Sequence, residues 1–312
     1  MDEGLVIKNT GSWYQVEDAK SHQTILCKLK GAFRLKEGAT TNPVAVGDRV
    51  DYQTEPDGTG VIAKIYPRKN YIIRRSSNLS RQAHVIAANL DQAFLLVTLD
   101  FPQTRLEFVD RFLVTAEAYN VPMSIILNKN DLYTEAYAPA LADFLHTYAL
   151  AGYPVYRVSA RTGEGIDTLR ELLQGRITLF SGNSGVGKST LIHAVDPTLN
   201  PRSGEISAVH NRGKHTTTFS EMFPLVEGGY IIDTPGIKGF GLVDLKKEEV
   251  GRYFPEIFRY APDCQYYNCT HTHEPGCAVQ QAVAEGEIGR SRYVSYLKVL
   301  DDEDSKYRKG DF

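Results

Sequence analysis

The sequence predicts three consecutive domains: a small β-barrel, an α/β domain with a parallel sheet, and a mainly helical domain that binds a metal. Short alternating strands fill the chain up to about Tyr66, strands and helices alternate from Asp91, and a cysteine–histidine cluster follows Leu245. Regular alternation of strands and helices indicates crossover units on a parallel sheet. We therefore place the domains at residues 1–67, 91–245 and 246–312, with a basic linker over 68–90.

The N-terminal domain is predicted to be all-β. Alternating stretches at 13–16, 24–29, 48–52 and 60–65 are typical of strands. The Asp57-Gly58 dipeptide is a strong hairpin signal between the last two. About five short strands in so short a segment favour a closed barrel of the OB-fold type. We assign Trp13 and Tyr14 to the core or wall of this barrel.

The central domain alternates between the two kinds of element. Strands are predicted at residues 93–99, 123–127, 154–158 and 177–180, and helices at 106–119, 138–150, 166–173 and 189–195. A hairpin is predicted to end the sheet, with strands at 219–226 and 230–232.

The composition argues against a membrane-spanning or disordered chain. Of the 312 residues, 42% are hydrophobic and 23% charged. No apolar run approaches the roughly 20 residues that cross a bilayer. Residues 1–11 carry two acids and lack the long apolar region of a signal peptide, so we expect no secretory signal. We predict a cytoplasmic monomer that makes no contact with membranes.

Two basic segments stand out on a chain whose net charge is −3. Their positive charge fits a localised nucleic-acid footprint, although solvated surface segments have the same composition. The basic residues, with no acid among them, are Arg68, Lys69, Arg74, Arg75 and Arg81 in one segment and Lys28, Lys30, Arg34 and Lys36 in the other.

A phosphate-binding loop is predicted between a strand and a helix. The pattern G-x-x-x-x-G-K-[ST] is matched by Gly182, Asn183, Ser184, Gly185, Val186, Gly187, Lys188 and Ser189, and Thr190 adjoins it. Backbone N–H groups and the helix N-terminus are expected to hold the phosphates. We expect Lys188 to bridge the β- and γ-phosphates and Ser189 to bind Mg²⁺.

A second loop carries the pattern N-K-x-D, which is typical of a surface loop when it stands alone but indicates guanine recognition when a phosphate-binding loop accompanies it. Asn128, Lys129 and Asp131 directly follow a predicted buried strand, at the edge where ligands of open α/β sheets bind. Asp131 can accept hydrogen bonds from the ring N–H and amine of guanine, a donor pair that adenine lacks. Asn128 can brace the loop, and the Lys129 stem can cover the ring. At the end of the next strand, Ser159 and Ala160 can offer a backbone N–H to guanine O6.

The remaining nucleotide elements follow the phosphate loop. Asp233 and Gly236 end an apolar strand, where they would hold Mg²⁺ through water and sense the γ-phosphate. In the polar stretch before it, Thr217 is our choice for a Mg²⁺ ligand, with Thr216 and Thr218 as alternatives. Ile237 stands where Ras-like enzymes place a water-orienting glutamine, so unassisted hydrolysis should be slow. His215 is a candidate catalytic group, and a loop histidine is the alternative.

The order of these elements is base, base, phosphate, metal, whereas conventional GTPases run phosphate, metal, base, base. Such a circular permutation preserves the sheet and the site because domain termini often lie close together. We therefore predict a GTPase that binds GTP or GDP with Mg²⁺.

A cluster near the C-terminus predicts one structural Zn²⁺. Cys264, Cys269, His271 and Cys277 supply three thiolates and one imidazole, a tetrahedral set without an open position. His273 is the competing nitrogen ligand, and unliganded reduced cysteines are the alternative. Neighbouring side chains could contact RNA or complete a hydrophobic shell around the metal: Tyr266, Tyr267, Arg290, Arg292 and Tyr293.

The permuted motifs, the barrel before them and the C-x4-C-x-H-x5-C cluster after them resemble the bacterial RsgA (YjeQ/YloQ) family of GTPases over essentially the whole chain. The resemblance implies a cytoplasmic factor that binds the nearly mature small (30S) ribosomal subunit in its GTP state. It also implies that the subunit stimulates hydrolysis, that release accompanies it, and that barrel and zinc domain contact ribosomal RNA. A nucleotide-gated RNA-binding module, or a GTPase acting on another RNA or on protein alone, are the alternatives.

Overall fold

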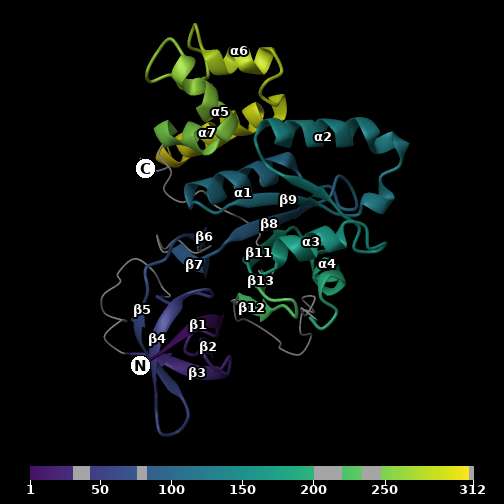
Figure 1. Ribbon diagram of the computed structural model, residues 1–312. Coiled ribbons are helices and arrows are strands. Elements are labelled where there is room, and N and C mark those ends of the chain that lie inside the picture. The colour runs from purple at the N-terminus through teal and green to yellow at the C-terminus, as the bar shows by residue number, and fades with distance from the viewer. Residues whose placement is uncertain (31–42, 76–82, 200–219, 234–246, 309–312) are drawn as a thin grey trace, which may run out of the picture.

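The computed structural model describes residues 1–30, 43–75, 83–199, 220–233 and 247–308 (Figure 1). The N-terminal barrel lies at the bottom of the view, the α/β domain in the middle and the C-terminal helices at the top. The predicted site residues His215, Thr217 and Gly236, and the alternatives Thr216 and Thr218, lie outside the described residues. No helix in the described ranges is long and apolar enough to cross a membrane.

Five strands close the N-terminal barrel, which matches the predicted number, although only four of them were located from the sequence. They are β1 (Asp2–Asn9), β2 (Tyr14–Asp18), β3 (Thr24–Leu29), β4 (Arg49–Thr54) and β5 (Gly60–Ile65). The strand order is β1-β2-β3-β5-β4, and β4 pairs back onto β1 to close the ring. Buried apolar residues alternate along the strands and fill the interior. Tyr14 belongs to this core, and Trp13 lies on the wall with the Lys28 ammonium 4.2 Å from its ring centre.

The segment that we expected to be a linker contains a β-hairpin. Strand β6 (Tyr71–Arg75) pairs with β7 (Ala83–Ala88) in a separate two-stranded sheet. Ile72, Ile73 and Val85 are buried, and this apolar content within a basic segment explains why it forms strands.

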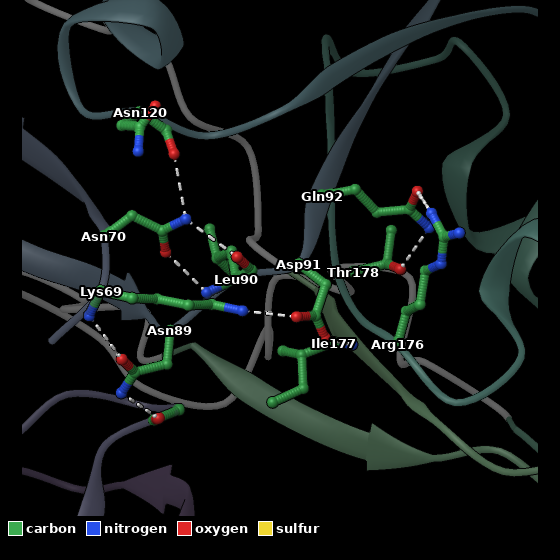
Figure 2. Close-up of polar contacts among 11 residues, drawn as sticks. Lys69, Asn70, Asn89, Leu90, Asp91, Gln92, Asn120, Arg176, Ile177 and Thr178 are labelled. Atoms are coloured by element: carbon green, nitrogen blue, oxygen red, sulfur yellow. Dashed lines mark hydrogen bonds and ion pairs between the residues drawn. The ribbon is translucent and has the colours of Figure 1, made fainter.

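Polar bonds fasten this hairpin to the α/β domain (Figure 2). The Asn70 side chain bonds both backbone groups of Leu90, at 2.8 and 2.9 Å, and also donates to the carbonyl of Asn120. Lys69 pairs with Asp91, whose other oxygen accepts from the backbone N–H of Ile177 at 2.8 Å. The hairpin is therefore joined to the start of the strand that leads into the phosphate loop.

Six strands form the sheet of the α/β domain, in the order β10-β9-β8-β11-β13-β12. They are β8 (Gln92–Val97), β9 (Met123–Leu127), β10 (Val155–Arg157), β11 (Ile177–Gly182), β12 (Glu221–Pro224) and β13 (Tyr230–Asp233). The first five in spatial order are parallel, and β12 is antiparallel to β13 as the predicted hairpin requires.

Helices cover both faces of this sheet. They are α1 (Leu106–Ala118), α2 (Ala138–Leu150), α3 (Ile166–Leu173) and α4 (Lys188–Val195). Helices α1 and α2 pack on one face, and α3 and α4 on the other (Figure 1). Strand β8 is buried on both sides: Leu95 faces the first layer and Phe94 the second. This burial accounts for the continuous apolar runs that predicted a parallel sheet.

The barrel extends the sheet of the α/β domain. Strand β1 pairs antiparallel with β12 at Lys8 and Glu221, whose side chains also form an ion pair of 2.7 Å. The Tyr230 hydroxyl donates to Glu17 of β2 at 2.8 Å. Barrel and α/β domain therefore share one 11-stranded sheet.

The C-terminal domain packs on α1 and α2. It consists of the 3-10 segments η4 (Lys247–Tyr253) and η5 (Ala261–Asp263) and of the helices α5 (Pro255–Tyr260), α6 (Ala278–Ala284) and α7 (Arg290–Arg308). Val114 of α1 belongs to its hydrophobic core. Gly289 allows the start of α7 to approach α2 closely, since a Cβ there would lie 2.8 Å from Thr147.

Candidate nucleotide site and metal cluster

The predicted phosphate loop connects β11 to α4, as expected. Gly185 and Gly187 have φ values of 84° and 92°, which favour glycine. A Cβ on Gly187 would also lie 2.5 Å from the Asn128 amide, so this position requires glycine for space as well. The backbone of this loop and the N-terminus of α4 thus form a cradle that suits phosphate groups.

The predicted base loop lies against the phosphate loop. The Asn128 side chain donates to the carbonyl of Val186 at 2.8 Å and accepts from the backbone N–H of Ala160 at 3.3 Å. Lys129 Nζ donates to the carbonyls of Gly185, at 2.8 Å, and of Phe101. The permuted chain therefore brings its base and phosphate loops together, although about 50 residues separate them.

Asp131 is held in a defined position. The Ser159 hydroxyl donates to one carboxylate oxygen at 2.6 Å, and the guanidinium of Arg161 lies 4.0 Å from the other. The Asp131 side chain is only 15% exposed, whereas that of Arg161 is 82% exposed. A carboxylate fixed in this way can accept two hydrogen bonds from a base.

Lys188, at the start of α4, meets Asp233, the last residue of β13. Their side chains form an ion pair and are 12% and 13% exposed. Burial lowers the pKa of the Lys188 ammonium to about 8, which still leaves it mostly protonated at neutral pH. Ser189 and Thr190 belong to the first turn of α4, beside Lys188. A cation and a carboxylate thus meet beside a helical turn that carries two hydroxyl-bearing residues, a combination that suits Mg²⁺ and nucleotide phosphates.

The four predicted zinc ligands converge. Cys264, Cys269, His271 and Cys277 place their ligand atoms within 4.8 Å of one another. The Sγ atoms of Cys264 and Cys277 are 3.9 Å apart, and each lies 3.5 Å from Nδ1 of His271. Tetrahedral zinc with bonds of about 2.3 Å to sulfur separates its ligand atoms by about 3.8 Å. The cluster therefore fits a zinc ion.

Residues around the cluster brace its loop. Glu274 accepts from the backbone N–H groups of Thr270 and Thr272, at 2.7 and 2.9 Å. Tyr293 donates to the carbonyl of His271. The competing ligand His273 is exposed and contacts the Thr272 hydroxyl instead.

Arg292 does not belong to an RNA-facing surface, contrary to one interpretation of the sequence. Its side chain is 0% exposed and bonds Asp110 and Glu256. Tyr293 is half-buried, whereas Tyr267 is fully exposed. The sequence pattern could not separate these residues because burial depends on the packing of α7 against α1.

Replacing Cys269 by serine is expected to remove zinc and to loosen the C-terminal domain. The hydroxyl is a poor substitute for a thiolate, and structural zinc sites contribute directly to folding. Metal content per chain and thermal unfolding of the purified protein would measure both effects. His273→Ala is the matched control and should keep the full zinc equivalent. A full equivalent in Cys269→Ser would contradict the assignment.

Two parts of the chain match known protein families. Residues 65–243 match the RsgA GTPase family, and residues 3–62 match the RsgA N-terminal domain. The chain belongs to the RsgA GTPase family. It is therefore a GTPase, and the RsgA family implies a guanine nucleotide and Mg²⁺ as its ligands.

Named members of the RsgA family match this chain over nearly its full length. A protein of Bacteroides fragilis named small ribosomal subunit biogenesis GTPase RsgA is 59% identical over 98% of this chain and 99% of its own. The protein of the same name from Flavobacterium psychrophilum is 49% identical over 98% of this chain and 94% of its own.

Two solved structures share the fold. The crystal structure of YjeQ from Thermotoga maritima is 35% identical, covers 96% of this chain and 98% of its own, and superposes with a TM-score of 0.78. YloQ, described as a circularly permuted GTPase, is 29% identical over 98% of this chain and 96% of its own, with a TM-score of 0.75. The circular permutation that the motif order predicts is thus confirmed.

Replacing Asp131 by asparagine is expected to move base preference from guanine toward xanthine. The amide presents a donor where the carboxylate accepted, which suits the xanthine carbonyl and leaves the guanine amine unpaired. We expect GDP affinity to fall at least about 100-fold while xanthosine diphosphate gains affinity. Titration of both nucleotides would measure the change, and unchanged selectivity would exclude this role for Asp131.

Proposed function

We propose that this chain is a GTP-hydrolysing factor in the biogenesis of the small ribosomal subunit. The observation that carries the proposal is its 59% identity, over nearly the full length of both chains, to a protein of that printed name. The juxtaposed base and phosphate loops supply the nucleotide chemistry that such a factor requires.

In this proposal the GTP-bound form binds the nearly mature 30S subunit late in maturation of its decoding region. The subunit stimulates hydrolysis, and release of the factor accompanies it. Ile237, next to Gly236, supports a dependence on the subunit because an aliphatic side chain cannot orient the attacking water. His215 is our candidate for a group that assists hydrolysis.

We propose specific roles for the nucleotide-site residues. Asn128, Lys129 and Asp131 hold the guanine base, with Ser159 and Ala160 completing that side. The segment from Gly182 to Thr190 holds the phosphates. Lys188 neutralises the β- and γ-phosphates, and Ser189 and Thr217 ligate Mg²⁺. Asp233 holds Mg²⁺ through water, and Gly236 contacts the γ-phosphate.

Contacts with ribosomal RNA are proposed for the two outer domains. The barrel and the C-terminal domain flank the α/β domain on opposite sides (Figure 1). Lys28 and Lys30 are exposed on the barrel, and Tyr267 is exposed beside the cysteine cluster. Arg68 and Lys69 contribute less than their charge suggested, because they pair with Asp48 and Asp91. We also propose that the factor is a monomer. We place it in the cytoplasm because the small ribosomal subunit is found there and because that compartment keeps thiols reduced.

The decisive experiment is GTP turnover with and without purified 30S subunits, with 50S subunits and free RNA as controls. We expect strong stimulation by 30S subunits alone. A second function, a nucleotide-gated RNA-binding module, is favoured by the same Ile237 and would give nucleotide-dependent binding with unchanged turnover. Flat turnover without nucleotide-dependent binding to 30S subunits would exclude both.

A further inference from the structure

Tyr133 lies two residues after Asp131 and joins the base loop to the loop that follows β8. Its hydroxyl donates to the carbonyl of Asn128 at 2.8 Å. The same oxygen accepts from the backbone N–H of Leu99 at 2.9 Å. Burial raises the pKa of Tyr133, so the hydroxyl keeps its proton and can fill both roles.

The Asn128 carbonyl belongs to the peptide bond that precedes Lys129, a residue with a strained backbone conformation. Lys129 has a φ of 64° and a ψ of 34°, in the left-handed region that costs a side-chain-bearing residue free energy. Such a conformation persists only where neighbours hold it. The N–H of Asn128 is bonded to the carbonyl of Val97 at 3.0 Å, and Tyr133 holds its carbonyl.

Leu99, the second partner of Tyr133, belongs to a turn that also contacts Lys129. Leu99 begins the turn that contains Phe101, whose carbonyl accepts from Lys129 Nζ. Pro102 of this turn lies against Gly185, at 3.2 Å from the place of its missing Cβ. Tyr133 thus contacts the base loop at its backbone and, through Leu99, the turn that holds the end of the Lys129 side chain.

We propose that Tyr133 is a positioning residue of the guanine site. Its hydroxyl presets the Asn128–Lys129 peptide, so that the Lys129 stem and the Asp131 carboxylate stand ready for the base. The inference rests on the proposed role of Asn128, Lys129 and Asp131 in base recognition. It adds to the guanine site a positioning residue that lies outside the sequence pattern by which the loop was identified.

The test is the substitution Tyr133→Phe, which keeps the ring and removes only the hydroxyl. The Asn128 carbonyl and the Leu99 N–H each lose a partner, so we expect GDP and GTP affinity to fall about tenfold. The affinity ratio of GDP to inosine diphosphate, which lacks the amine that Asp131 would read, should fall too. KM for GTP should rise by a larger factor than kcat falls. A role in packing alone would leave the nucleotide ratio unchanged.

Tyr137→Phe is the matched control. Tyr137 packs beside Tyr133, with ring centres 5.5 Å apart, but its hydroxyl donates to the Asp100 side chain. We expect this variant to keep the GDP to inosine diphosphate ratio of the unaltered protein. An equal fall of the ratio in both variants, or no fall in Tyr133→Phe, would overturn the proposal.

Two further measurements keep the outcome interpretable. Amide exchange at Leu99 in the unaltered protein should be slow without nucleotide, because its partner is internal; fast exchange would overturn the proposal even if Tyr133→Phe fails to fold. Asp131→Asn should be measured in parallel. A change of base preference there, with none in Tyr133→Phe, would refute the positioning role alone and leave the guanine site intact.

Discussion

Replacement of Lys188 by alanine is expected to abolish tight nucleotide binding. Lys188 is the first residue of α4, directly after the predicted phosphate loop, and its side chain is only 12% exposed, so water would screen its attraction for phosphates weakly. The substitution also leaves the Asp233 carboxylate without its partner, beside the expected position of the phosphates. We expect GDP and GTP affinity to fall by at least about two orders of magnitude.

Equilibrium titration with a fluorescent GDP analogue would measure this loss. Lys64→Ala is a suitable control, because Lys64 is an exposed barrel lysine with a 56% exposed side chain. It should bind nucleotide as the unaltered protein does. Retained tight binding in Lys188→Ala would contradict the account of the phosphate loop.

Removal of the Arg292 guanidinium is expected to lower the free energy of unfolding strongly. The guanidinium bonds Glu256 at 2.7 and 3.2 Å and Asp110 at 2.9 Å, and it lies 4.7 Å from the ring centre of Phe254. Asp110 belongs to α1, whereas Arg292 and Glu256 belong to the C-terminal domain. Arg292→Ala would leave two carboxylates buried without a cation, which typically costs about 3–5 kcal/mol of unfolding free energy.

Denaturant unfolding of the zinc-loaded chain would measure this cost. Arg290→Ala, an exposed position on the same helix, should change stability little. Burial raises the pKa of Asp110, and loss of Arg292 would raise it further. A raised carboxyl pKa favours the folded state at low pH, so the deficit should shrink as pH falls from 7 toward 5. A loss below about 1 kcal/mol at pH 7 would mean that the triad is not a stability element.

Local patterns predicted most of the elements because their signals are carried by neighbouring residues. The strands and helices of the α/β domain follow the predicted ranges within a few residues. The phosphate loop was predictable because close backbone approach demands glycine at Gly187 and Lys188 must follow it. The permutation was predictable from motif order alone, since each motif can form at the end of its own strand.

Other features depend on residues that are distant in the chain. The β6–β7 hairpin was assigned to a linker because the segment is basic and its buried isoleucines, Ile72 and Ile73, are adjacent and show no strand-like alternation. Strand β1 was not predicted, and its pairing with β12 joins Lys8 to Glu221. Tyr133 carried no signal, because a tyrosine two residues after N-K-x-D is as compatible with an exposed loop as with two hydrogen bonds to the backbone.

The sequence by itself determined the chemistry of this protein: a guanine-nucleotide site in permuted order and a set of three cysteines and one histidine suited to zinc. The type and spacing of the residues suffice to predict these sites, because phosphate, base and metal each require particular residues at short spacings along the chain. Only the tertiary structure decided which basic and aromatic side chains face solvent. Arg292 is buried among acids and aromatic rings, whereas Arg290, two residues earlier, is exposed. The physical reason is that burial follows from the docking of α7 on α1, and no local pattern encodes that contact.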